Sequence, residues 1–140
     1  FFSHVGVGEC YGFFAMLDRF LQYCSLFYAD RLYTRSMKKY GETSMGVLWS
    51  NRESQILRFR TLMKEIKSGS INDFGCGYGA LFQYLQEIEY RGSYIGYDMN
   101  TIMIKHAKNR YPNKKASFYC TKQILFPASF TVVSGTLNLE

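Results

Sequence analysis

The stretch that decides the fold is SINDFGCGYG, residues 70–79. A short predicted strand over 70–74 leads into three glycines at alternating positions, Gly75, Gly77 and Gly79, and a helical pattern follows them. Glycines let the backbone turn sharply and bring its N–H groups close to a ligand, because no Cβ stands in the way. The N-terminus of the following helix adds partial positive charge. The stretch therefore predicts a strand, a turn and a helix that together suit a carboxylate, a phosphate or another electron-rich group.

The same alternation of strand and helix continues downstream of the glycines. Strands that alternate with helices predict a parallel sheet with right-handed crossovers, which is the doubly wound α/β class with a Rossmann-like fold. The chain contains no internal repeat, low-complexity tract or linker that would interrupt this pattern. The helices are predicted over 80–89 and 99–110, and the later strands over 93–98, 116–120 and 130–134.

One carboxylate is predicted to lie beside the glycine turn. Asp98 follows Gly79 by 19 residues and ends the second predicted strand. Because the carboxyl ends of parallel strands share one edge of the sheet, Asp98 is placed where it can accept both hydroxyl hydrogens of a ribose. The alternative is an exposed cap of the next helix, since Asp is common at that position.

The kind of nucleoside ligand is left open by the glycines themselves. Gly75, Gly77 and Ala80 also satisfy the dinucleotide pattern GxGxx(G/A). Asp73 argues against a dinucleotide, because apolar residues usually lead into that pattern. An acidic residue at this place can instead receive a hydrogen bond from an ammonium group or from the loop.

These residues resemble a family. The segment from Asp73 to Gly79, with Asp98 after the second strand, resembles class I S-adenosylmethionine-dependent methyltransferases. The resemblance extends over residues 40–139. It includes the third-strand motif at 118–122, the fourth strand and its following turn at 130–137, and a lead-in at 40–49 with Gln55, Arg58 and Phe59 that is similar to some small bacterial members.

The resemblance implies S-adenosylmethionine as the cofactor, bound by the turn that includes Cys76 and Gly79. It implies that Gly75 and Gly77 pass close to the methionine part. By the same resemblance Asp98 holds the ribose, and Met99 lies against the adenine.

Further positions are carried over by the same resemblance. Thr121 and Lys122 fall where the adenine amino group is met, while Ser134 and Gly135 fall where the fourth strand reaches the sulfonium and the substrate. Trp49 and Arg58 would close over the methionine end, with Arg58 pairing with its carboxylate. A solvated helix face for Arg58, and a core position for Trp49, are the alternatives.

Two features depart from the family pattern. Lys122 stands where the family often has an aspartate, and a cation cannot accept the hydrogen bond of the adenine amino group. Only 71 residues follow Gly69, whereas one strand and its helix use about 25–30. We therefore expect a sheet truncated after its fourth strand, so that the chain is the N-terminal, cofactor-binding part of a longer protein. In the family strand order 3-2-1-4-5-7-6 the fourth strand then becomes an exposed edge that can pair with another chain.

The region before the sheet, residues 1–69, is predicted to be helical, with residues 70–140 forming the partial cofactor-binding domain. Apolar residues between Phe13 and Tyr28 recur on one face of a helix, which is expected to pack on the fold. The alternatives for this face are a lid over a pocket, a partner contact and a membrane-surface contact. A more polar helical segment over 29–39 ends at Gly41, and a loop follows over 43–49. Ser50 and Glu53 predict a capping box that opens a second amphipathic helix, ending near Ser68 and Gly69.

Composition restricts the function further. The 140 residues fit one domain, and 47% hydrophobic residues exclude a disordered chain. The net charge of +6 comes from scattered Lys and Arg, which does not support a nucleic-acid substrate. Four cysteines without a CxxC pair argue against zinc and fit a reducing, cytoplasmic compartment. The apolar run near the N-terminus is too short to span a membrane.

The reaction remains incompletely defined by the sequence. Neither His4 nor His106 has neighbours that would make it a general base, so the catalytic residues are unknown. The methyl acceptor is equally open, with a small molecule slightly favoured. The alternatives to a methyltransferase are a nicotinamide or flavin dinucleotide-binding protein and a non-catalytic remnant of the methyltransferase fold.

Overall fold

The computed structural model describes residues 27–43, 45–47, 51–112 and 115–134. The chain divides into two compact units, residues 1–32 and 33–140. Of the first unit, residues 27–32 are described, and they are helical with Arg31 placed over the ring of Phe27. The predictions for residues 13–26 of the first helix and for His4, Trp49 and Gly135 fall outside the described residues, whereas Phe27 and Tyr28 at the end of that helix are exposed.

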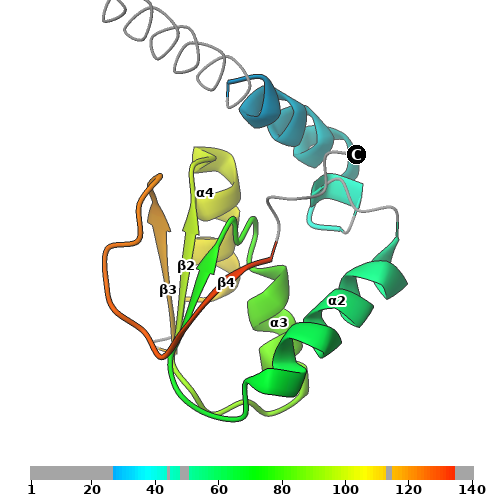
Figure 1. The fold of residues 1–140 in the computed structure, drawn as a ribbon. Helices are drawn as coiled ribbons and strands as arrows, with labels where there is room; N and C mark the ends of the chain where they lie inside the picture. The colour runs from blue at the N-terminus through cyan, green and yellow to red at the C-terminus, as the bar shows by residue number, and fades with distance from the viewer. Residues whose placement is uncertain (1–26, 44, 48–50, 113–114, 135–140) are drawn as a thin grey trace, which may run out of the picture. The chain divides into compact units, whose positions relative to one another are not determined.

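The second unit is built on four parallel strands (Figure 1). They are β1 (Ile71–Phe74), β2 (Tyr94–Asp98), β3 (Ala116–Cys120) and β4 (Phe130–Val133), and their order across the sheet is β3-β2-β1-β4. Ile71 of β1 is in register with Tyr94 on one side and with Phe130 on the other. The doubly wound class and the strand order 3-2-1-4 are therefore confirmed.

Three helices accompany the sheet, α2 (Arg52–Glu65), α3 (Ala80–Glu87) and α4 (Thr101–Arg110). Their apolar residues and the inward side chains of the strands form one core, which burial of apolar surface stabilises. Aromatic rings dominate its centre: Phe82 lies 5.1 Å from Tyr94 and 5.0 Å from Tyr111 between ring centroids. The buried members include Phe59, Met63, Ile71, Leu81, Leu85, Ile104, Ala107, Phe118 and Val132.

The connection from β3 to β4, residues 121–129, contains no helix and contacts side chains of β1, β2 and β3 (Figure 1, orange). Its Phe126 ring lies 5.4 Å from Tyr119, and its backbone N–H donates to the Tyr97 hydroxyl at 3.3 Å. The Phe126 carbonyl accepts from the amide of Asn72 at 2.7 Å. Both hydrogen bonds and an aromatic contact therefore hold this segment against the sheet.

The start of α2 differs from the expected capping box at Ser50. Asn51 is the N-cap: its backbone is extended, and its side-chain oxygen accepts from the Ser54 N–H at 2.8 Å. The helix ends at Glu65, because the backbone of Ile66 is already extended. The prediction that Gly41 ends the preceding helix is confirmed, since residues 27–40 are helical and Gly41 has φ +64.

One glycine inside β2 allows the turn after β1 to pack tightly. Gly96 is in register with Asp73 of β1, and a Cβ on Gly96 would lie 2.7 Å from the Cys76 sulfur and 2.8 Å from the ring of Phe118. Cys76 itself is buried in the core. The absence of a side chain at position 96 therefore makes room for the thiol beneath the glycine turn.

We predict that Gly96→Ala lowers the free energy of unfolding by about 1–3 kcal/mol, the usual effect of an added methyl in a packed core. Urea denaturation followed by circular dichroism measures it. Cys76→Ala in the same chain removes the nearest atom and should restore part of the loss. An undiminished loss in the double variant would show that the thiol is not the obstacle.

Candidate functional site

The glycine turn is attached to the end of β2. The backbone N–H groups of Gly75 and Cys76 both donate to the Tyr97 carbonyl, at 2.8 Å and 3.1 Å. Gly79 is the N-cap of α3 with φ +88, a conformation that side chains rarely adopt. The first N–H groups of a helix have no partner within it. The turn therefore directs the N-terminus of α3 toward the carboxyl edge of the sheet.

Asp98 lies against this turn, as predicted. Its Oδ2 accepts from the Gly77 N–H at 2.9 Å, and its Oδ1 accepts from the Asn100 N–H at 2.8 Å. The alternative that Asp98 caps the next helix is wrong, because Asn100 is the N-cap of α4 and accepts from the Met103 N–H. A half-buried carboxylate therefore stands beside a backbone turn at the carboxyl end of β2.

A helical segment that sequence reasoning assigned no role also borders this edge. Thr34 accepts a hydrogen bond from the Asn100 side chain at 2.8 Å. Burial, with a smaller effect from Asp98, raises the pKa of the neighbouring Tyr33 phenol. Met37 is buried with Tyr78 of the glycine turn. The four-residue spacing of Tyr33 and Met37 is the pattern that could have indicated this contact face.

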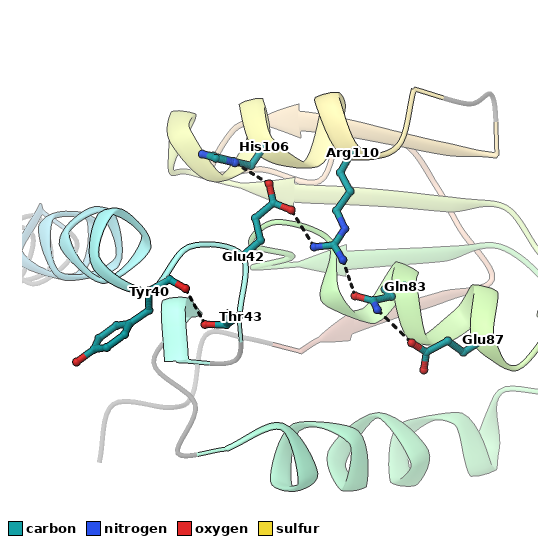
Figure 2. A network of polar contacts seen from close by, with 7 residues as sticks. All are labelled: Tyr40, Glu42, Thr43, Gln83, Glu87, His106 and Arg110. Carbon is teal, nitrogen blue, oxygen red and sulfur yellow. Dashed lines mark hydrogen bonds and ion pairs between the residues drawn. The ribbon is translucent and has the colours of Figure 1, made fainter.

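The segment after this helix is held by a polar network (Figure 2). Glu42 accepts from Arg110 at 2.8 Å and lies 2.7 Å from the His106 ring nitrogen. Arg110 also donates to Gln83, which donates to Glu87. Partly exposed ion pairs of this kind stabilise only weakly one by one, so the network mainly sets the position of the segment on α3 and α4.

Asp73 is the most completely buried charged group of the site, with an exposed fraction of 0%. Its Oδ2 accepts from the Tyr94 hydroxyl and its Oδ1 from the Ser134 hydroxyl, each at 2.6 Å. Burial raises the pKa of Asp73 to about 6, against the lowering effect of the two hydroxyls. The carboxylate expected to meet an ammonium group or the loop thus meets one hydroxyl on β2 and another just after β4.

Cys76 and Met99 are two further residues expected at the cofactor site. The Cys76 thiol lies in the core, donates to the Gly77 carbonyl at 3.6 Å, and has its pKa raised strongly by burial. Met99 is half-buried, and its carbonyl accepts from the Cys120 thiol at 3.6 Å. Their roles toward a cofactor stay predictions.

The remaining predicted positions are dispersed. Thr121 joins the ends of β2 and β3, because its N–H donates to the Asp98 carbonyl at 2.9 Å. Lys122 is exposed in the segment after β3, and Arg58 is half-buried on α2. Another α2 side chain, Gln55, is hydrogen-bonded to the Tyr78 phenol. Thr121 therefore belongs to the sheet edge that carries Asp98, and the proposed contacts of Lys122 and Arg58 stay predictions.

No group of three or more His, Cys, Asp or Glu among the described residues is arranged to hold a metal ion. No helix within the described ranges has both the length and the apolar character needed to cross a membrane.

Comparison with known proteins agrees with this geometry. A family model of the methyltransferase domain matches residues 72–136, which include the turn, Asp98 and β4. Residues 72–136 therefore match a methyltransferase domain, in agreement with the resemblance that the sequence carries. The matched part includes the glycine turn from which the fold was predicted.

Individual relatives share limited stretches with this chain. A Mycobacterium tuberculosis protein with the provisional name of methyltransferase is 39% identical over 51% of this chain and 43% of its own length. A similarly named protein of Invertebrate iridescent virus 6 is 35% identical over 45% of this chain and 25% of its own. The chain therefore spans less than half the length of these curated relatives. A solved methyltransferase of Mesorhizobium loti is 23% identical, covers 44% of this chain and 28% of that one, and has a TM-score of 0.38.

The raised pKa of Asp73 predicts how stability depends on pH. Between its ordinary value of 3.8 and about 6 the folded chain binds this proton and the unfolded chain does not, so stability falls as the pH rises through that range. The full change from this group is about 3 kcal/mol. Urea denaturation from pH 4 to 7 measures it.

Asp73→Asn should remove this slope, because the amide does not titrate. Glu65→Gln is the matched control, since it neutralises an exposed carboxylate and should leave the slope in place. A slope that survives in Asp73→Asn would assign the titration to another group.

Proposed function

We propose that this chain binds S-adenosylmethionine at the turn from Gly75 to Gly79 and at Asp98, and forms the cofactor-binding half of an enzyme that transfers a methyl group. The observation that carries the proposal is the 2.9 Å contact between the Asp98 carboxylate and the Gly77 N–H. This contact places a carboxylate, which can accept hydrogen bonds from a ribose diol, beside a backbone turn at the carboxyl edge of a parallel sheet. Nucleosides bind at this edge in folds of this kind.

The residues present fit such a ligand. Asp98 is half-buried and ionisable, which suits a ribose diol, and the positive end of α3 suits a carboxylate. When bound, the cofactor supplies an electrophilic methyl group on a sulfonium, so the protein has mainly to bind and orient. In this proposal Gly75 and Gly77 pass the methionine part, and Met99 and Thr121 border the adenine.

The segments before the sheet support a covering role. Thr34, Met37 and Gln55 contact residues next to Asp98 or within the glycine turn. In the proposal these segments exclude water from the cofactor, and Arg58 and Trp49 lie nearer the methionine end. A lid of this kind would also limit which acceptors reach the methyl group.

The proposal also extends to the methyl acceptor and to the location of the protein. A small-molecule acceptor is slightly favoured, and a cytoplasmic location fits the cysteine content. No side chain is assigned as general base; His106 belongs to the polar network with Glu42. Such a base is needed only where the acceptor loses a proton.

We predict that Asp98→Ala weakens S-adenosylhomocysteine binding about a hundredfold, because two hydrogen bonds to a charged group are lost. Isothermal titration calorimetry on the wild-type and variant chains measures the affinity. Thermal unfolding of the variant shows whether its fold persists, because Asp98 also receives bonds from Gly77 and Asn100.

Glu65→Ala serves as the control, since it removes an exposed carboxylate on α2. An affinity that Asp98→Ala leaves unchanged would contradict the ribose assignment. A chain that binds NADH and gives no response to S-adenosylhomocysteine would contradict the proposed cofactor.

The outer edge of β4 supports a second, separate proposal, that it pairs with another chain. β4 is an end strand of the described sheet, and its Phe130 and Val133 side chains are 36% and 44% exposed. Unpaired edge groups favour association with a further strand.

For this pairing we predict concentration-dependent association in analytical ultracentrifugation. Val133→Lys should weaken it about tenfold or more, because a charge at an edge strand opposes strand addition. Leu57→Lys, on exposed α2 surface, is the matched control. A wild-type chain that stays monomeric at all concentrations would contradict the pairing.

A further inference from the structure

The Asp73 carboxylate links three strands of the sheet. Asp73 lies in β1, Tyr94 lies in β2, and Ser134 directly follows β4. Both hydroxyls donate to this one carboxylate at 2.6 Å, one to each oxygen. The side chains of Asp73, Tyr94 and Ser134 are all buried.

The strands that carry the two hydroxyls differ in the number of neighbouring strands with which they pair. Tyr94 belongs to β2, which is paired with β1 on one side and with β3 on the other. Ser134 follows Val133, the last residue of β4, and β4 is paired with β1 alone among the described strands. The position of the end of β4 therefore depends on Asp73 more than the position of β2 does.

We propose that Asp73 is a positioning residue, which through Ser134 fixes the carboxyl end of β4 beside the glycine turn and does not itself bind the cofactor. The inference rests on the proposed function, since it concerns how that cofactor site is shaped. Asp73 is only two residues before Gly75, so a fixed distance between Asp73 and Ser134 also fixes the end of β4 relative to the turn.

The burial of Asp73 separates this role from direct binding. A carboxylate with no exposed surface, whose two oxygens already accept short bonds, has no face turned to a ligand. An ionised carboxylate accepts from both hydroxyls, whereas a protonated one must use one oxygen as a donor. Protonation should therefore weaken both links, because neither bond is then made to a charged group.

Other groups near Asp73 do not obscure this protonation. The ionisable side chains that face it are Tyr94 of β2, Cys76 of the turn and Asp98 at the end of β2. Burial raises the pKa of the Tyr94 phenol and of the Cys76 thiol, so both stay neutral near pH 6. The Ser134→Ala variant separates Asp73 from Asp98, because it keeps the Asp98 carboxylate and should lose the pH dependence only if Asp73 is the group that titrates.

The test is S-adenosylhomocysteine titration from pH 5 to pH 8 on the wild-type chain and on two matched variants, Ser134→Ala and Tyr94→Phe. Each variant removes one hydroxyl from the same carboxylate. The wild-type affinity should fall about fivefold to tenfold as the pH is lowered. Ser134→Ala should bind at every pH with the affinity that the wild type has at low pH, and should show no pH dependence. Tyr94→Phe should bind within about twofold of the wild type at pH 8.

A thermodynamic cycle adds a second readout. If Asp73 acts through Ser134, the variant with both Asp73→Asn and Ser134→Ala should bind no more weakly than either single variant. Fully additive losses would overturn the proposal, since they would indicate separate contacts. Histidine changes charge in the same pH range, so the titrations are repeated with His106→Gln, which should keep the pH dependence.

The outcomes separate this inference from the function on which it rests. A wild-type chain that binds no S-adenosylhomocysteine at any pH refutes the proposed function, and the inference with it. A chain that binds the ligand through Asp98, while Ser134→Ala keeps both wild-type affinity and pH dependence, refutes the inference alone. Binding that weakens in Ser134→Ala and loses its pH dependence supports both.

Discussion

The attachment of the glycine turn to β2 is the constraint on which the rest of the site depends. One carbonyl, that of Tyr97, accepts from two successive N–H groups, and the next residue, Asp98, accepts from Gly77. The backbone of the turn and the carboxylate of β2 are therefore fixed by neighbouring peptide groups of the same strand. Side chains of the turn, such as Cys76 and Tyr78, are buried around this junction, whose geometry is fixed by the backbone hydrogen bonds.

Sequence patterns were sufficient to predict the strands of the sheet, because each strand is a short apolar run that can be recognised in its own segment of the chain. The alternation of strand and helix after Gly69 predicted the doubly wound sheet, and the family resemblance implied its strand order. The spacing of Asp98 from Gly79 predicted that Asp98 lies close to the turn. The start of α2 was wrong by one residue, since Ser50 and Asn51 are both good caps and only backbone geometry distinguishes them. Local sequence seldom resolves such boundaries.

The contacts that sequence reasoning missed are those between residues far apart in the chain. The hydrogen bond from Asn100 to Thr34 joins positions 66 apart, and the bond from Ser134 to Asp73 joins positions 61 apart. Neither has a motif, because a threonine or serine with a free hydroxyl is common at any surface. Asp73 was singled out correctly as unusual, but its partner depended on the register of β4, which only the folded sheet determines.

The position of β1 in the sheet also bears on the order in which the chain can fold. β1 is central, yet one of its two neighbours is β4, whose residues are made almost 60 positions later. Until residues 130–134 have emerged from the ribosome, β1 has an open side and Asp73 lacks the Ser134 donor. Pairings this distant in sequence close slowly, because the loop entropy must be overcome before the contact forms. The central strand of the sheet is thus among the last to be completed.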